Sequence, residues 1–132
     1  MFTLALLSFL AISCVSPKVT IHKKMVGKDG VVQLDKQPEF VGGWDAYEEY
    51  FKKQLKYPTK AKINGTEGKV VVSFVVRKDG GTITDVEVVK SVSPEIDEEA
   101  IRLISNMPNW KPAIEDGKEV SVRMQIPLDF KL

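Results

Sequence analysis

The clearest periodicity in the chain is EVSVRMQIPLDFKL (residues 119–132). Apolar residues stand at every even position of this stretch, and polar residues or Pro127 stand between them. A period of two places the apolar side chains on one face, so the stretch predicts one long, half-buried strand. Because Pro127 has no N–H for a ladder hydrogen bond, we expect an edge position or a bulge there.

Upstream, KVVVSFVVRKDGGTITDVEVVK (residues 69–90) predicts a β-hairpin. The first strand covers 69–77 and is rich in β-branched residues, and Lys78-Asp79-Gly80-Gly81 supplies the turn. The return strand covers 82–90, with Asp85 and Glu87 directed outward. The inward side chains are Val70, Val72, Phe74 and Val76 on the first strand, and Val86 and Val88 on the second.

A first helix is predicted from the helical spacing of Trp44, Tyr47, Phe51 and Leu55. It ends at Tyr57-Pro58, because the residue before a proline is pushed out of the α region. Pro58 opens a second short helix that runs to Ile63 and closes at Asn64-Gly65.

A third helix is predicted from Ser93-Pro94-Glu95, where a capping hydroxyl precedes a proline and an acid in the first turn. Pro108 ends it, and the loop NWKPAIEDGK (109–118) leads to the last strand. The buried stripe of this helix consists of Ile96, Ala100, Leu103, Ile104 and Met107.

These elements predict an α+β fold of two layers, an antiparallel three-stranded sheet with helices packed on one face. Polar residues at alternate positions predict that the other face of the sheet meets water. We expect the folded domain to cover residues 41–132 and a linker to cover 18–40, with one short strand near Val31-Val32.

Composition excludes several classes of function. The 132 residues suffice for one domain, and nineteen basic against eighteen acidic residues argue against a nucleic-acid-binding protein. The one cysteine and one histidine exclude an intrachain disulfide and a Cys/His metal site, and no cofactor motif is found. A Cys14–His22 dyad lacks a supporting core, so we expect no enzyme.

The segment 1–17 carries no charge and reads as a targeting segment. Its residues Leu10-Ala11-Ile12-Ser13-Cys14 resemble a bacterial lipoprotein cleavage box, which would make Cys14 the lipidated first residue of the mature chain. An ordinary signal peptide and a short membrane anchor are the alternatives.

No catalytic arrangement emerges from the remaining motifs. We interpret the acidic cluster Glu95, Asp97, Glu98 and Glu99 as a solvated helix N-terminus. Trp44 and Trp110 are expected in the core. The open edge of the last strand remains, and it can receive an extended peptide, pair in a dimer or be covered by the N-terminal tail.

The ordered motifs in residues 37–132 resemble the C-terminal domain of the TonB family. The matching features are the Tyr57-Pro58 pair, Gly68 before the first strand, the Asp-Gly turn, the loop Trp110-Lys111-Pro112 and the closing IPLDF (126–130). The resemblance implies a non-enzymatic periplasmic domain, anchored to the membrane in the envelope of a Gram-negative bacterium.

The family's domains bind a short N-terminal segment of outer-membrane receptors, the TonB box, by adding it as a strand beside the last strand. The resemblance therefore assigns receptor contacts to Gln54, Tyr57 and Pro58. It also assigns the acceptor edge to the last strand, at Val120, Val122, Met124 and Ile126.

The front of the chain departs from the family pattern, because it shows no proline-rich spacer after the apolar segment. Receptor binding is therefore expected to carry over better than coupling to an inner-membrane proton-driven motor. The alternative function is a structural or adaptor lipoprotein of the envelope that uses the same fold without such coupling. A homodimer formed through open sheet edges is a further alternative.

Overall fold

The computed structural model describes residues 20–21 and 34–132. Several predictions fall on other residues and lie outside the described part of the chain. They are the targeting segment at 1–17, lipidation of Cys14, the position of His22 and the short strand near Val31-Val32.

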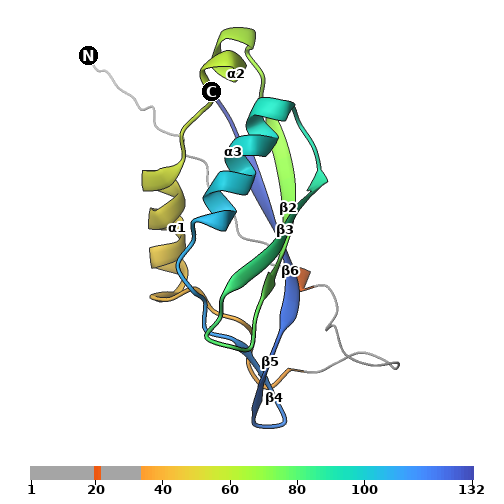
Figure 1. The fold of residues 1–132 in the computed structure, drawn as a ribbon. Helices are drawn as coiled ribbons and strands as arrows, with labels where there is room; N and C mark the ends of the chain where they lie inside the picture. The colour runs from red at the N-terminus through yellow and green to blue at the C-terminus, as the bar shows by residue number, and fades with distance from the viewer. Residues whose placement is uncertain (1–19, 22–33) are drawn as a thin grey trace, which may run out of the picture.

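The described residues form a strongly twisted antiparallel sheet with α1 and α3 on one side of it (Figure 1). The strand order in the main sheet is β1-β6-β2-β3, and β4 and β5 form a separate two-stranded sheet. This confirms the predicted α+β fold and adds a two-residue fourth strand, β1, beside β6. The elements are β1 (Thr20–Ile21), α1 (Gly43–Gln54), α2 (Thr59–Asn64), β2 (Gly68–Val76), β3 (Ile83–Lys90), α3 (Pro94–Ser105), β4 (Ala113–Glu115), β5 (Lys118–Val120) and β6 (Val122–Phe130).

The pairing of β2 with β6 is the longest in the sheet. It runs without a register shift from Gly68 opposite Phe130 to Val76 opposite Val122. The side chains that face the helices are fully buried along both strands, as the alternating sequence predicts. Each such valine, isoleucine or phenylalanine contributes about 1.5–3 kcal/mol by leaving water.

Pro127 stands inside this ladder, opposite Val71. A proline fits in a paired strand only where its nitrogen points away from the neighbouring strand. The nitrogen of Pro127 therefore faces the outer edge of β6, and the predicted edge position is the one found. Since backbone polar groups alternate in direction along a strand, those of Arg123 and Gln125 face the same outer edge.

The last strand begins later than predicted. Val120 belongs to β5 and pairs with Ala113 of β4, and only the residues from Val122 onward join the main sheet. The cause is the turn at Asp116 and Gly117, whose φ angles of 51° and 74° fold the chain back on itself. An Asp-Gly pair is the usual sequence of a two-residue hairpin turn. The prediction that 109–118 is a loop was therefore wrong for its second half.

The helices bury aromatic side chains against the sheet. Tyr47 and Phe51 of α1 are buried, and every residue of the predicted α3 stripe is buried. The ring of Trp110 lies 5.6 Å from that of Phe40 and 5.7 Å from that of Phe74, which confirms its place in the core. Trp44 is 52% exposed, so the prediction of a core position was wrong there. It occupies the first turn of α1, where only the edge of its ring meets Tyr47.

Residues 34–40 already contact the packed body. Backbone hydrogen bonds join Lys36 to Ile114 and Glu39 to Lys111, and the side chain of Phe40 is 4% exposed. The domain boundary at residue 41 stays a prediction, and in the structure the contacts of the packed body extend back to Leu34.

The loop that carries Trp110 is fastened to the β2–β3 turn. The backbone N–H of Trp110 donates to the carbonyl of Gly81, and Gly81 has a φ of +73°. A Cβ atom at Gly81 would lie 1.5 Å from the Trp110 carbonyl oxygen. The approach of the two backbones therefore requires glycine at this position.

We expect Gly81→Ala to lower the free energy of unfolding by more than about 3 kcal/mol, since it combines a backbone clash with a left-handed φ. Gly80→Ala is the matched control, because Gly80 has the same φ of +73° and open space around it. That control is expected to cost only about 1–2 kcal/mol. Urea denaturation measures both values, and equal losses in the two variants would contradict the close approach.

Candidate functional site

The segment from Gln54 to Pro58 forms a corner between α1 and α2. The backbone of Leu55 is extended, with φ of −66° and ψ of 126°, and Pro58 is extended as well. Pro58 is the N-cap of α2 rather than its first helical residue, so α2 begins one residue later than predicted. We call residues 54–58 the Tyr-Pro corner.

Two charged side chains of α3 hold the backbone of this corner. The Glu99 carboxylate accepts the N–H of Lys56 at 2.7 Å, and Nη2 of Arg102 donates to the carbonyl of Gln54 at 2.7 Å. Arg102 also forms a bidentate pair with Glu99, at 2.6 and 2.8 Å. This pair raises the pKa of the Arg102 guanidinium. The corner is therefore fixed by charge-assisted hydrogen bonds from another element.

The interpretation of residues 95–99 as a solvated helix terminus was wrong for Glu99. Its side chain is buried, because its partners at the Tyr-Pro corner come from a distant part of the sequence. Asp97 and Glu95 make contacts near the start of α3. Asp97 accepts the N–H of Val92 at 3.0 Å, and Glu95 pairs with Lys60 at 3.2 Å. Hydrogen bonds from its own backbone N–H and from Lys60 lower the pKa of Glu95.

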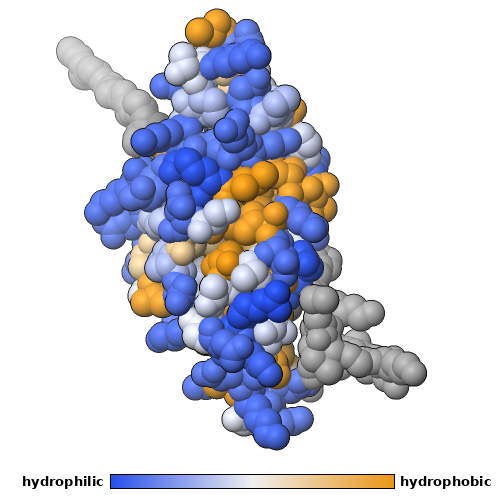
Figure 2. Space-filling model, viewed as in Figure 1, coloured by the Kyte–Doolittle hydropathy of each residue, from blue (hydrophilic) through white to orange (hydrophobic). Residues whose placement is uncertain are grey.

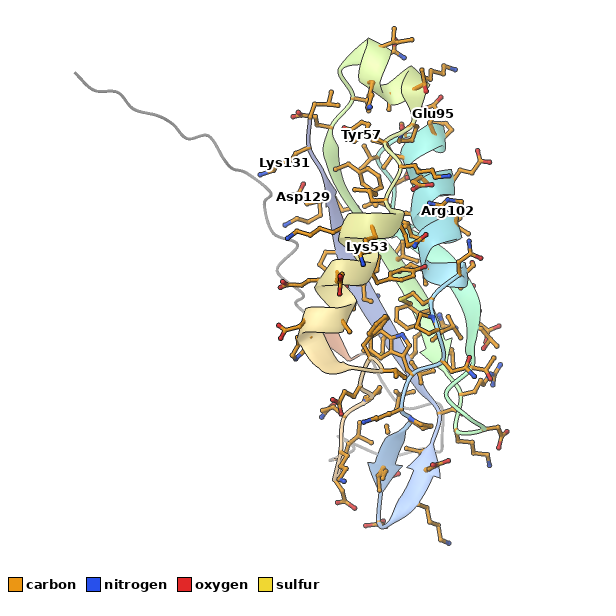
Figure 3. The ribbon with its side chains drawn as sticks, turned by 90° about the vertical axis from the view of Figure 1, so that its left-hand side faces the viewer. Lys53, Tyr57, Glu95, Arg102, Asp129 and Lys131 are labelled. Carbon is orange, nitrogen blue, oxygen red and sulfur yellow. The ribbon has the colours of Figure 1, made fainter. Side chains whose placement is uncertain are left out.

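Tyr57 joins the Tyr-Pro corner to the carboxyl end of β6 (Figure 3). Its ring packs edge-on against Phe130, with 5.7 Å between the centroids, and its hydroxyl donates to the Thr66 carbonyl. Partial burial, then the negative charges of Glu67 and Asp129, raise the pKa of Tyr57. The hydroxyl is therefore protonated at neutral pH, and it can donate this hydrogen bond.

The assignment of the acceptor edge to Val120, Val122, Met124 and Ile126 stays a prediction, and the structure shows where these residues lie. The side chains of Val122, Met124 and Ile126 are fully buried toward the helices. An added strand would meet the outward backbone groups of Arg123 and Gln125 instead. The sequence signal for this was Pro127, whose orientation determines which alternate residues face the edge.

The outer face of the sheet is less open to water than predicted. Ser73 and Val75 of β2 point to this face and are buried. The guanidinium of Arg123 reaches across from β6 and donates to the Ser73 hydroxyl at 2.5 Å. Arg123 thereby shields part of this face next to the outer edge of β6.

The structure brings some of the predicted site residues together and separates others. Tyr57 packs against Phe130 at one end of β6, whereas Val120 lies in β5, before the other end. The nine residues of β6 span about 30 Å at roughly 3.3 Å per residue. One extended segment along β6 would reach both the outward edge residues and the Tyr-Pro corner.

Within residues 20–21 and 34–132, no helix is both long and apolar enough to cross a membrane. In the same part of the chain, no three His, Cys, Asp or Glu side chains gather where they could hold a metal ion.

Comparisons with known proteins agree on one family. The family model described as Gram-negative bacterial TonB protein C-terminal matches residues 53–132. Protein TonB from two strains of Helicobacter pylori is 36% and 35% identical over 78 residues, which are 58% of this chain and 26% of each relative. The chain thus matches about a quarter of the length of these curated relatives. An NMR solution structure of the H. pylori TonB C-terminal domain aligns with a TM-score of 0.50 and 27% identity, covering 66% of this chain and 90% of that one.

The contacts of Glu99 lead to a prediction for the Tyr-Pro corner. Glu99→Gln removes the charge that pairs with Arg102 and is expected to lower the free energy of unfolding by about 1–3 kcal/mol. The amide signal of Lys56 should shift in NMR spectra, because its acceptor changes. The exposed neighbour provides the control, and Glu98→Gln should stay within about 0.5 kcal/mol of the wild type. Equal changes in the free energy of unfolding of the two variants would show that Glu99 does not hold the Tyr-Pro corner.

Proposed function

This chain belongs to the family of Gram-negative bacterial TonB protein C-terminal domains, and from that membership we propose that it is a receptor-binding module of the periplasm. The family is non-enzymatic, which confirms that the chain is not an enzyme. Its task in this proposal is to take up an extended N-terminal segment of a TonB-dependent outer-membrane receptor as an added strand. Energy-coupled transport through that receptor is the process that it would serve.

The observation that carries the proposal is the outer edge of β6. This edge borders a ladder without register shifts, and the backbone groups of Arg123 and Gln125 face it. A regular edge offers hydrogen bonds at the spacing that an extended peptide needs. The buried inner side chains hold the strand in place, so a partner would meet a rigid template.

The opposite edge of the sheet is less suited to strand addition. The pairing of β2 with β3 contains two register shifts, and Asp85 of β3 has a left-handed φ of 53°. An ion pair of 3.0 Å between Arg77 and Asp85 fixes this irregular backbone. Bulges of this kind twist an edge away from a neighbouring strand.

The surface near β3 differs from the outer edge of β6, because apolar side chains gather there. Figure 2 shows apolar side chains gathered where α3 lies over β3, elements that carry Ile101 and the half-buried Val86 and Val88. A partner at this side would pack side chains rather than pair backbones. The proposed strand therefore belongs at β6.

The Tyr-Pro corner supports the same placement. It lies at the carboxyl end of β6, and its backbone is held by Glu99 and Arg102 while the Gln54 and Lys56 side chains are exposed. A segment running along β6 would meet these side chains at the end of the strand. Preorganised contacts of this kind avoid the entropy cost of ordering a loop on binding.

Coupling to a proton-driven motor of the inner membrane is the second part of the proposal. It rests on the relatives named TonB, of which this chain matches about a quarter. Attachment of the chain to the membrane belongs to the same part. Recovery of motor subunits together with the tagged full chain from envelope extracts would test it.

Strand addition can be tested with a synthetic peptide that copies the N-terminal segment of a TonB-dependent receptor. We expect its titration to shift the backbone amide signals of Arg123 and Gln125, and those of the Tyr-Pro corner, since new hydrogen bonds form there. Scrambled peptide serves as the control. Shifts confined to α3 and β3 would refute the placement at β6.

The part played by Tyr57 can be separated into binding and support. Tyr57→Phe keeps the ring on Phe130 but loses the hydrogen bond to Thr66, and we expect it to lower the free energy of unfolding by about 1 kcal/mol. Tyr57→Ala removes the ring as well and is expected to weaken peptide binding while the protein still melts cooperatively. If Tyr57→Ala abolishes cooperative melting, Tyr57 is a core residue and its contact role fails.

A further inference from the structure

The outer edge of β6 already carries a strand of this chain. Thr20 of β1 lies opposite Gln125, and Ile21 lies opposite Met124, in antiparallel pairing (Figure 1). This is the edge on which the proposed receptor segment would add. The site is therefore not free in the structure, although the other edge, along β3, has no described partner strand.

The usable length of the β6 edge is short. Pro127 directs a nitrogen without a hydrogen toward it, so no donor is available there. At the other end, β6 begins at Val122, after the chain has left the β4–β5 hairpin. Between these limits, the outward-facing residues with both a donor and an acceptor are Arg123 and Gln125.

β1 occupies that stretch directly. A backbone N–H or C=O on the edge of a sheet can pair with one neighbouring strand at a time. While Thr20 stands opposite Gln125, a second strand cannot use the same groups. Binding of β1 and binding of a receptor segment in register with β6 therefore exclude each other.

The pairing of β1 is short enough to be displaced. It comprises two residue pairs, against nine between β2 and β6. Because β1 is part of the same chain, it acts at an effective concentration on the order of millimolar for a short tether. An intrachain strand that closes with an equilibrium constant of about 10 weakens the apparent affinity for a competitor about tenfold.

We propose that β1 is a resident competitor for the strand site on β6, a latch that a receptor segment must displace in order to bind. The proposal rests on the proposed function, since it concerns regulation of the same site. Displacement frees the N-terminal side of the chain from the sheet at the moment when the receptor binds. Occupation by β1 keeps the edge covered at other times.

The test uses the full chain with Thr20→Pro, which removes the backbone N–H that faces Gln125 of β6. We expect the receptor peptide to bind this variant about threefold to thirtyfold more tightly than the wild type, because the competitor is lost. Val26→Pro, outside β1, is the matched control and should leave the affinity unchanged. Ile21→Pro is a second control, because the N–H of Ile21 points away from β6 and its loss removes no hydrogen bond between the two strands.

A second probe tests the latch without a receptor. A peptide that copies residues 17–24 of this chain should bind the Thr20→Pro variant and shift the amide signals of Arg123 and Gln125. It should shift them much less in the wild type, where β1 holds the edge.

The outcomes separate the two proposals. Equal affinity of the receptor peptide for the wild type and for Thr20→Pro would overturn the latch and leave the proposed function standing. If the receptor peptide binds none of the forms, the proposed function fails and the role of a competitor falls with it. Failure of the 17–24 peptide to bind the Thr20→Pro variant would show that β1 has no affinity for the edge, and would overturn the latch alone.

Discussion

The antiparallel pairing of β2 with β6 is the constraint on which the rest of the structure depends. It brings the end of the chain into the interior of the sheet, with Phe130 opposite Gly68. Both helices pack on the apolar side that this pairing creates. Because β3 covers the other edge of β2, the second edge of β6 faces outward, and β1 pairs with it at Met124 and Gln125. The location of the proposed binding strand thus follows from a single ladder.

The helices fix the backbone of the Tyr-Pro corner next to one end of that edge. α3 buries its apolar stripe on the sheet and presents Glu99 and Arg102 to the chain that leaves α1. Removing a buried carboxylate from water is costly unless it is paired and hydrogen-bonded, and here both conditions are met. Pro58 prevents the chain from continuing as a helix, and the tertiary contacts of Glu99 and Arg102 determine the shape of the resulting corner. The core of the protein and its candidate binding surface are joined by the same pair of side chains.

Much of the fold could be predicted from periodicity alone. The alternation in residues 122–130 and the helical spacing of Ile96, Ala100 and Leu103 are local patterns, and the structure contains the elements that they indicate. The hairpin at 78–81 follows from a local signal as well, because glycine acts on the neighbouring backbone. α1 ends at Gln54, before the predicted end at Tyr57-Pro58, because Leu55 is already extended. The Asp116-Gly117 turn carried an equally local signal that was overlooked, and the start of the last strand was misplaced as a result.

The candidate site was harder to predict, because its determinants are distant contacts. Nothing near Glu99 in the sequence indicates burial, since its partners at Lys56 and Arg102 meet it only after α1 and α3 are packed. The acceptor edge was assigned to residues whose side chains are apolar, whereas strand addition uses the backbone of the residues between them. Pairing of Thr20 with Gln125 joins the two ends of the described chain, and no pattern in either segment specifies the other.

An exposed strand edge is also a hazard, because copies of one chain can pair through it and extend a sheet without limit. Pro127 interrupts the outer edge of β6, because its nitrogen has no hydrogen to donate there. β1 covers part of the same edge. In a domain that we propose to accept a foreign strand, one proline and two residues of its own chain therefore limit the pairing of this edge with further copies.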